Sequence, residues 1–246
     1  KRVHKVLSYP LSIVYYIFLS LSLLVFHPIQ WICLKIFGYQ AHKKSVDVLQ
    51  WFLMRSANVL GTTFSVSGRD KLPKGSSIIY VSNHQSMFDI VSIIWFLRET
   101  HPKFVSKKEL GKGIPSVSFN LRHGGSVLID RKDAKQALTA IRELGKYIQK
   151  HNRSAVIFPE GTRSRNGQPK RFSENGLKML CKFAPDAYVV PLTINNSWKL
   201  FRFGMFPMGL GSQITLQVHD PIKITDYEFE DLFEKVEKTI VSSVIK

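Results

Sequence analysis

The spacing of apolar positions changes about a quarter of the way along the chain. From Val6 to Leu34 there is no Asp, Glu, Lys or Arg, and apolar residues follow one another closely. Pro10 and Pro28 bracket a cleaner segment, which is somewhat shorter than the roughly 20 apolar residues that a membrane-crossing helix needs. A second apolar stretch runs from Val46 to Leu60. The pattern predicts two apolar helices in the first part of the chain.

Beyond Gly61 the apolar runs become short and alternate with helical patterns, which is typical of α/β folds. The sequence predicts strands at Thr63–Ser67 and Ser126–Ile129, and short apolar runs predict buried strands at Ser77–Val81, Ala155–Phe158 and Tyr188–Ile194. Apolar and polar residues alternate over Gln213–His219, which predicts a half-exposed strand nearer the sheet edge. Apolar residues at helical spacing predict helices over Ser86–Leu97, Ala134–Ile148 and Phe229–Ile240.

These patterns divide the chain into two parts. We predict a membrane-associated helix pair over residues 1–61 and an α/β domain over residues 62–246. The two cysteines, Cys33 and Cys181, lie far apart in the sequence, and Cys33 is in an apolar run. We therefore expect neither a disulfide framework nor a cysteine-rich metal site.

The net charge narrows the choice of partners. The chain carries a formal charge of +17, which favours nucleic acid, anionic lipid headgroups or phosphorylated substrates. The apolar amino-terminal region and the lack of a known nucleic-acid-binding module favour lipid over nucleic acid. We therefore predict a membrane-associated protein with no nucleic-acid partner.

Positive residues lie on both sides of the first apolar run: Lys1, Arg2 and Lys5 before it, and Lys35, Lys43 and Lys44 after it. A single span would then have no clear orientation under the positive-inside rule. A secretory signal is the alternative, but no small-x-small cleavage site follows the run. We predict that the helix pair dips into one leaflet and returns, with its lysines among the headgroups of the cytoplasmic face, as in a bacterial inner membrane.

His84 and Asp89 lie at a predicted junction between a strand and a helix, where α/β sheets often bind ligands. On a continuous helix, side chains five residues apart would point in different directions, but a turn before the helix would let them meet. His84 could then accept a proton while Asp89 fixes the imidazole tautomer and stabilises its charged form. The alternative is that Asp89 only complements the helix dipole and His84 is an ordinary polar residue.

Two basic segments also follow predicted strands. In the first, Gly161 permits a close approach of the backbone, and Arg163 offers a guanidinium that suits a phosphate. Arg131 follows another strand and could join the same site. A solvated basic loop around Arg163, and a surface ion pair between Arg131 and Asp130 or Asp133, are the alternatives. Pro191 interrupts a predicted strand, which usually marks an edge or a bulge, and could shape the floor of a cleft.

Four segments, in this order and spacing, resemble the four sequence blocks of the glycerolipid acyltransferases. They are Asn83 to Asp89, Gly125 to Arg131, Phe158 to Ser164, and Val189 to Thr193. Lys107 fits the same pattern between the first and second blocks. The resemblance covers roughly residues 64–195. The Asp130–Arg131 pair is similar to that of members that acylate lysophosphatidate.

The resemblance implies a fold and a role for each matching residue. The fold would be α/β, with a central mixed sheet flanked by helices and a membrane-embedded pair of helices before it. His84 would be the general base and Asp89 its partner. Arg163 would hold the phosphate of the acceptor. Matching positions with less definite roles are Glu160, Gly161, Thr162, Arg131 and Lys107 in the phosphate-binding region, and Asn83, Gly125 and Pro191 as supporting residues.

The implied reaction moves a fatty acyl group from acyl-CoA or acyl carrier protein to the sn-2 hydroxyl of lysophosphatidic acid, giving phosphatidic acid. The sequence has no Gly-x-Ser-x-Gly elbow, no His-x3-His and no clustered Cys and His. We therefore expect no catalytic metal and no cofactor besides the thioester co-substrate. Two alternatives remain: an acyltransferase for glycerol 3-phosphate or another lysolipid, and a non-enzymatic membrane lipid-binding protein.

Overall fold

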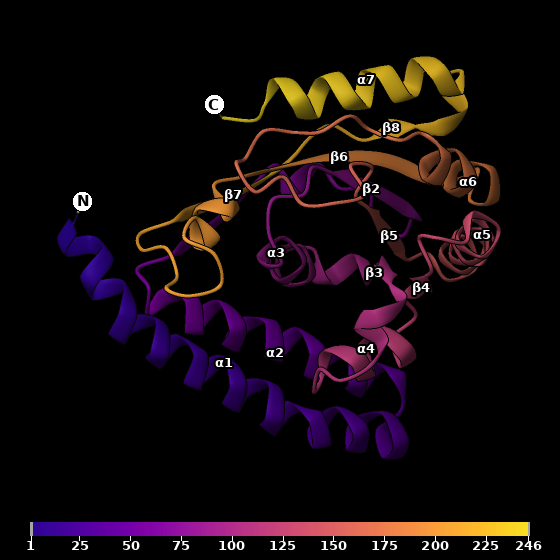
Figure 1. Cartoon of the computed structure of the whole chain (residues 1–246). Coiled ribbons are helices and arrows are strands. Elements are labelled where there is room, and N and C mark those ends of the chain that lie inside the picture. Colours follow the sequence, from indigo (N-terminus) through magenta and orange to yellow (C-terminus); the bar gives the residue numbers. More distant parts are fainter. Residues whose placement is uncertain (1, 246) are drawn as a thin grey trace.

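The structure, a computed structural model, describes residues 2–245 and the side chains of residues 5–245. Lys1 and the side chain of Arg2, two of the predicted headgroup contacts, lie outside this part. Two helices open the chain, α1 (Arg2–Phe37) and α2 (Tyr39–Asn58), and they run back along one another (Figure 1). Gly38 makes the tight link between them with a φ of 78°, which glycine adopts without strain.

Pro10 and Pro28, which bracket the cleaner apolar segment of the sequence, do not end helix α1. Both Pro10 and Pro28 lie inside the helix, which continues for 36 residues. A proline interrupts one hydrogen bond of a helix, and long apolar helices tolerate this when neighbouring groups compensate. The described residues contain one helix long and apolar enough to cross a membrane by length and composition, Lys5–Phe37, and only 22% of its most apolar window is buried.

The remainder forms a sheet with helices on both faces. Its strands are β1 (Thr63–Ser67), β2 (Ile78–Ser82), β3 (Pro102–Lys107), β4 (Val127–Ile129), β5 (Ser154–Ile157), β6 (Tyr188–Asn195), β7 (Gln213–Val218) and β8 (Ile222–Lys223). Its α-helices are α3 (Phe88–Phe96), α4 (Val117–His123), α5 (Ala134–His151), α6 (Asn175–Phe183) and α7 (Phe229–Ser242). Short 3-10 helices include η3 (Lys108–Gly111) and η4 (Ser197–Phe201).

The strand order is β1-β7-β6-β2-β5-β3-β4, with β8 also paired to β6. Strands β6, β2, β5, β3 and β4 are mutually parallel, whereas β6 pairs with β7 and β8 in antiparallel fashion. The sheet is therefore mixed, as predicted. Since the segments after β2, β5, β3, β4 and β6 all leave the same edge of the sheet, this carboxyl edge is where chemistry-bearing loops can meet.

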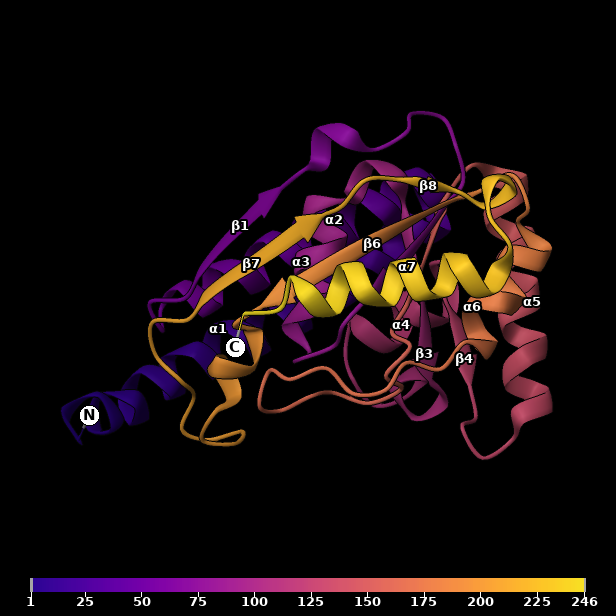
Figure 2. The same cartoon turned by 90° about the horizontal axis from the view of Figure 1, so that it is seen from above.

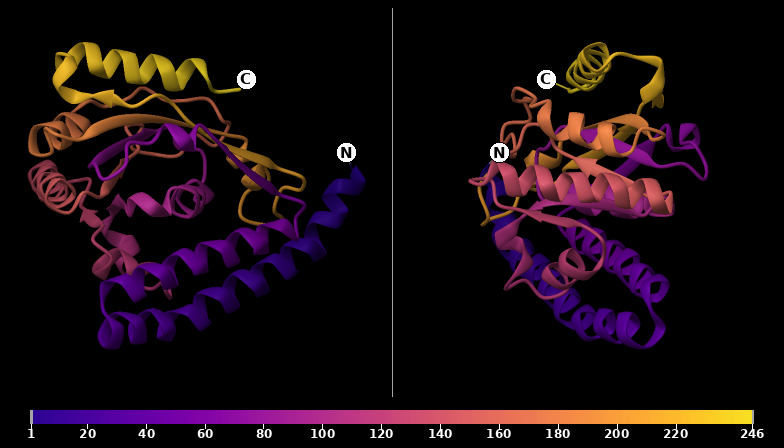
Figure 3. Two further views of the ribbon diagram at one scale, coloured as in Figure 1. Left: turned by 180° about the vertical axis from the view of Figure 1, so that it is seen from behind. Right: turned by 90° about the vertical axis from the view of Figure 1, so that its right-hand side faces the viewer.

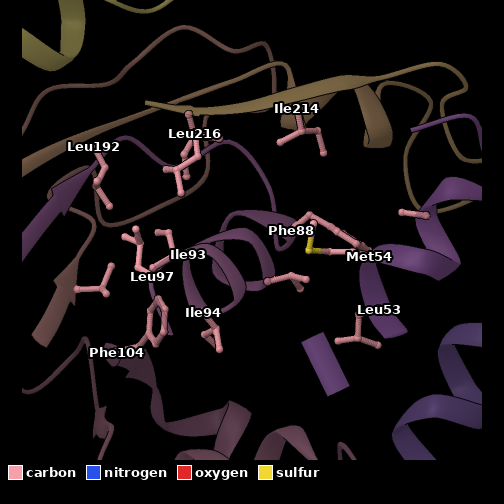
Figure 4. Packing of buried hydrophobic residues seen from close by; sticks show 14 of the residues in the cluster. Leu53, Met54, Phe88, Ile93, Ile94, Leu97, Phe104, Leu192, Ile214 and Leu216 are labelled. Carbon is pink, nitrogen blue, oxygen red and sulfur yellow. The ribbon is translucent and has the colours of Figure 1, made fainter. Parts of the chain in front are cut away.

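The core has two layers, because strand residues alternate between the two faces of the sheet. In β2, Ile78 and Tyr80 face the cluster that contains α2 and α3, and Ile79 and Val81 face the cluster with α5, α6 and α7. Figure 4 shows the first cluster, in which Phe88 and Ile93 of α3 lie between the sheet and α2. Figure 2 shows α7 lying along the other face of the sheet. The helix pair therefore lies on the opposite side of the molecule from α7.

Several elements differ from the sequence prediction. Strand β3 and helices α4 and α6 were not predicted, and α3 begins at Phe88 rather than at Ser86. The strand β3 escaped notice because it starts with a proline and carries lysines at positions 103 and 107. Helix α3 starts two residues later than predicted, and the backbone N–H of Ser86, which precedes it, donates to the side chain of Asp89.

Candidate active site

His84 and Asp89 meet in the turn between β2 and α3. The Nδ1 atom of His84 lies 2.8 Å from Oδ2 of Asp89. The pair can form because residues 83–86 are not helical, so the two side chains do not follow a helical repeat. A hydrogen bond of Nδ1 to a carboxylate places the proton on Nδ1, which leaves Nε2 of the neutral ring as an acceptor for a substrate proton. The side chain of His84 is 14% exposed, whereas Asp89 is fully buried.

The carboxylate of Asp89 accepts hydrogen bonds from backbone and side-chain donors on both of its oxygens. The backbone N–H groups of Gln85 and Ser86 donate to Oδ2 over 2.6 Å and 2.9 Å. The hydroxyl of Ser197, from η4, donates to Oδ1. A buried charge is costly unless it is hydrogen-bonded, and these donors satisfy that requirement. The carboxylate is therefore fixed in position before any ligand arrives.

Loop 158–170, which follows β5, holds His84 from the other side. The ring of Phe158 stacks on the imidazole with centroids 4.1 Å apart. Glu160 accepts the backbone N–H of His84 over 2.7 Å and that of Lys170 over 2.9 Å. Burial raises the pKa of the Glu160 carboxyl, and these two hydrogen bonds oppose the rise. Glu160 thus acts on the position of His84 through the backbone.

Strand β6 is joined to the same turn by amide side chains. Asn83 donates to the carbonyl of Ile194 and accepts its N–H, both over 2.8 Å. Gln85 accepts the N–H of Ser197 over 3.1 Å and donates to the carbonyl of Gly167 over 3.2 Å. These bonds fasten three loops to one another: those after β2, β5 and β6.

The predicted phosphate-binding residues lie along the carboxyl edge, and among them Glu160 bonds the backbone of His84 directly. Arg163 is exposed in the loop after β5. Lys107 ends β3, and Arg131 follows β4, whose Ile129 pairs with Lys107. Burial lowers the pKa of the Arg131 guanidinium, and nearby Glu109 opposes this. The three cations therefore lie at the ends of three neighbouring strands, β5, β3 and β4.

Gly161 and Thr162 form the exposed part of the loop after β5. Gly161 has a φ of 67°, and no atom lies within 4 Å of the place where a Cβ would sit. The need for glycine here is therefore conformational. Lys170 donates from Nζ to the Thr162 hydroxyl over 2.8 Å and to the carbonyl of Arg163 over 3.1 Å. This lysine, absent from the predicted site, closes the loop on itself.

Two predicted supporting residues lie elsewhere. Gly125 precedes β4, at the end opposite Arg131, and a Cβ there would come within 2.9 Å of the Tyr147 hydroxyl. Pro191 was expected at an edge or a bulge, but β6 is an interior strand. It is accommodated because β6 pairs with β8 only up to Val189 and with β7 only from Leu192, so Pro191 lies at a break in that ladder.

Sequence reasoning missed Gln85 and Ser197 as members of the site. Gln85 was inside the first block, but its neighbours gave no reason to single it out. Ser197 follows a buried strand and the polar pair Asn195-Asn196, a pattern that could have placed it at the carboxyl edge. The described residues hold no group of three or more His, Cys, Asp or Glu side chains placed to bind a metal ion.

Comparison with known proteins extends the likeness beyond the site. A 1-acyl-sn-glycerol-3-phosphate acyltransferase of Borreliella burgdorferi is 28% identical over 187 residues, which is 75% of this chain and 72% of that protein. A protein of the same name from Helicobacter pylori is 36% identical over 132 residues, 52% of each chain. The chain thus spans about half to three quarters of the length of these relatives.

The fold matches a solved structure. The crystal structure of the 1-acyl-sn-glycerophosphate (LPA) acyltransferase from Thermotoga maritima superimposes with a TM-score of 0.77 and 23% identity, over 98% of this chain and 95% of that one. Because the match includes α1 and α2, the helix pair is part of the shared fold.

A family model described as "Acyltransferase" matches residues 63–195. This range is more than half of the chain, and it contains all four sequence blocks with the His84–Asp89 pair. The chain belongs to the acyltransferase family.

Proposed function

We propose that the protein transfers a fatty acyl group from a thioester to the sn-2 hydroxyl of lysophosphatidic acid. The observation that carries this proposal is the His84–Asp89 contact of 2.8 Å through Nδ1. It leaves Nε2 of a partly exposed imidazole as a base at the carboxyl edge of the sheet. The names of the relatives from Borreliella burgdorferi and Helicobacter pylori support lysophosphatidic acid as the acceptor.

In the proposed reaction, Nε2 of His84 takes the proton of the acceptor hydroxyl while that oxygen attacks the thioester carbonyl carbon. Asp89 stabilises the imidazolium that forms. The tetrahedral intermediate then collapses, the C–S bond breaks, and the imidazolium returns its proton to the departing thiolate. General base action of this kind contributes about 10²–10⁴-fold to the rate. Neither an acyl-enzyme nor a metal ion is required.

The acceptor phosphate would be held by Arg163, with Arg131 and Lys107 farther along the edge. A guanidinium can make two parallel hydrogen bonds to a phosphate, which fixes both its position and its orientation. Arg163 is exposed, so it can reach a headgroup without prior opening of the loop. The anionic thioester donor, acyl-CoA or acyl carrier protein, would be attracted by the net charge of +17.

The helix pair would hold the site at a membrane surface. Exposed apolar side chains cover α1, among them Ile13, Ile17, Phe18, Leu21, Leu24 and Val25, each more than half exposed. Burying such side chains in lipid removes them from water, which stabilises the membrane-bound state. A lysolipid could then react without leaving the bilayer. We propose that the pair dips into the leaflet of a cytoplasmic face, with both ends on one side.

Thiol release from a long-chain acyl thioester by the purified protein in detergent tests the reaction. Release that needs lysophosphatidic acid, and that is lost in His84→Ala, is expected. His151→Ala is the matched control, because His151 is exposed at the end of α5, at the opposite edge of the sheet. A His84→Ala variant as active as the His151→Ala variant would rule out His84 as the base, and a folded protein silent with every acceptor would favour a lipid-binding role.

A second assay tests the acceptor. Glycerol 3-phosphate, lysophosphatidic acid and 1-acylglycerol, which lacks the phosphate, are compared as substrates. Arg163→Ala should raise KM for lysophosphatidic acid and leave KM for 1-acylglycerol unchanged, whereas Arg142→Ala, on the exposed surface of α5, should change neither. Equal effects of Arg163→Ala on both acceptors would exclude Arg163 as the phosphate ligand.

Alkaline carbonate extraction and accessibility labelling of both ends of the helix pair test its placement. The proposal expects extraction-resistant protein with both ends labelled from the same side. Ends labelled from opposite faces would show that one helix crosses the membrane and would contradict the proposal.

A further inference from the structure

The loop that follows η4 exposes a group of large apolar side chains. Phe203, Met205 and Phe206 are 41%, 55% and 49% exposed. Outside α1 and α2, only four other large apolar side chains of the described residues are exposed: Met87, Tyr227, Val241 and Ile245. The loop at 202–211 is therefore the one place in the α/β domain where several such side chains gather within a few residues.

This loop lies against the amino-terminal half of α1, as Figure 1 and the rear view in Figure 3 show. The rings of Phe206 and Tyr9 are 5.6 Å apart, and both side chains are also exposed. Lys5 lies 5.8 Å from the centre of the Phe203 ring. The exposed apolar side chains of α1 and of the loop thus meet at Tyr9 and Phe206.

The loop is anchored at its base. Met208 is fully buried, and its N–H donates to the Ser12 hydroxyl over 2.7 Å. The Tyr16 hydroxyl donates to the carbonyl of Met205. Gly209 donates to the carbonyl of Leu200 over 2.7 Å, and any Cβ at Gly209 would lie 2.0 Å from the carbonyl oxygen of Lys199. These bonds fix the loop in place while the side chains of Phe203, Met205 and Phe206 at its tip stay exposed. Exposing such a group of apolar side chains to water is unfavourable unless another surface covers them.

The charges around the tip indicate what covers it. Arg202 lies 5.1 Å from the centre of the Phe203 ring, and Lys199 is nearby in η4. No Asp or Glu occurs between Asp186 and Asp220. Aromatic and apolar side chains rimmed only by cations are typical of segments that enter the headgroup region of an anionic bilayer.

We propose that the 202–211 loop is a second membrane-contacting element, which inserts Phe203, Met205 and Phe206 beside α1 into an anionic lipid surface. It adds a lipid contact from the α/β domain itself to that of the helix pair. Ser197, whose hydroxyl donates to the carboxylate of Asp89, lies in η4 only a few residues before this loop, so a short stretch of chain connects the lipid contact to a residue that bonds the His–Asp pair. The proposal does not depend on which acceptor is acylated.

A fluorescent label at position 205 tests insertion directly. Met205→Cys is made in the full chain with Cys33→Ser, and Cys181 is buried. The matched control is Val241→Cys on α7, where Val241 is 44% exposed. With vesicles of phosphatidylglycerol and phosphatidylcholine, the emission of an environment-sensitive label at 205 should shift to the blue, and that at 241 should not. Protein that floats with the vesicles and shows no shift at 205 would overturn the proposal.

Affinity provides the second measurement. Phe203→Ser/Phe206→Ser should weaken binding to the same vesicles at least about tenfold in a flotation assay, because two half-exposed aromatic rings no longer leave water. Val241→Ser/Ile245→Ser, which removes two exposed apolar side chains near the carboxyl terminus, should bind the vesicles as tightly as the unaltered protein does. Equal binding by both variants would contradict the proposal. If the phenylalanine variant does not fold, as judged by thermal unfolding, the label at 205 still decides.

Discussion

A single carboxylate organises the site. Asp89 accepts the two preceding N–H groups of its own turn, a hydroxyl from η4 and the imidazole of His84. The sequence left two alternatives for this residue, a pair with His84 or a contact with the helix dipole alone, and did not decide between them. One of the contacts that hold the carboxylate comes from Ser197, which is 108 residues away, and no pattern around Asp89 indicates it.

Replacing Asp89 by asparagine should keep the shape of the site and remove its charge. The amide would no longer stabilise the imidazolium, and its N–H₂ group would oppose the proton on Nδ1, which favours the wrong tautomer. We expect kcat for thiol release to fall about 10³–10⁴-fold with little change in KM. Circular dichroism and thermal unfolding serve as the control for folding. A variant that keeps a tenth of the activity would show that the carboxylate is not needed.

Lys103 presents a buried charge at the other end of the sheet. It is 6% exposed, and its Nζ donates to the hydroxyl of Tyr39 in α2 over 2.9 Å. Burial, followed by repulsion from Arg153 and Lys43, lowers the pKa of Lys103 from 10.5 to about 7. Between these pH values the unfolded chain binds more protons than the folded one, so this lysine makes stability rise with pH.

Lys103→Met should therefore be more stable than the unaltered protein near pH 7 and should lose this rise between about pH 7 and about pH 10. Thermal unfolding in detergent across that range is the measurement. Lys150→Met, at an exposed position of α5, is the control and should retain the pH dependence. If the stability of Lys103→Met changes with pH as steeply as that of the control, the lysine is charged in the folded protein throughout the range.

At the scale of elements, the sequence predicted the positions of most strands but not which strands pair with each other. The run Thr63–Ser67 is β1 to the residue, and Gln213–Val218 has the alternating burial expected of a half-exposed strand. Periodicity reports only which residues of a segment are buried. It could not reveal that β3 pairs with β5 and β4, because those pairings depend on contacts between distant segments, and the charges of Lys103 and Lys107 concealed the strand itself.

The side chain of Asn83 joins the end of strand β2 to strand β6. Its amide exchanges two hydrogen bonds with the backbone of Ile194, just beyond the last residue of β2. Asn83→Ala would leave a buried N–H and a buried carbonyl without partners, so we expect the free energy of unfolding to fall by about 2–4 kcal/mol. Chemical denaturation in detergent measures this.

Asn175→Ala, at an exposed position in α6, is the matched control and should cost less than about 1 kcal/mol. Asn83→Ala should also lower activity more than it lowers the folded fraction, since the turn that carries His84 begins at Asn83. A variant with normal stability would mean that water replaces the amide.

At the scale of the whole molecule, charge is unevenly distributed. Residues 220–246 hold seven acidic and four basic side chains, although the whole chain is strongly basic. This acidic segment includes α7, which lies on the side away from the helix pair (Figure 1). The molecule therefore has a basic, apolar side and a more acidic side, which would orient it at an anionic surface.

Binding to anionic vesicles should consequently have an electrostatic contribution, which salt weakens, and an apolar contribution, which salt does not remove. Raising the salt concentration from about 0.1 M to about 1 M shortens the screening length from about 10 Å to about 3 Å, so binding to phosphatidylglycerol vesicles should fall. It should fall to the level seen with neutral vesicles and not to zero, because the apolar contacts of α1 remain. Flotation at both salt concentrations measures this. Complete release at high salt would show that the helix pair does not enter the lipid.

The segment from Ser197 to Gly211 begins at the buried carboxylate of Asp89, contacts the first helix through Met208, and ends at Gly211, whose N–H donates to the carbonyl of Leu60. With its tip in the headgroup region, the height of the reactive imidazole nitrogen above the bilayer would be set by the protein and not by the lipid. This fixed height would set the depth in the bilayer at which a hydroxyl group can reach the imidazole. Hydroxyl groups that lie at that depth would react and deeper ones would not, so positional selectivity would follow from where the enzyme rests on its substrate's membrane.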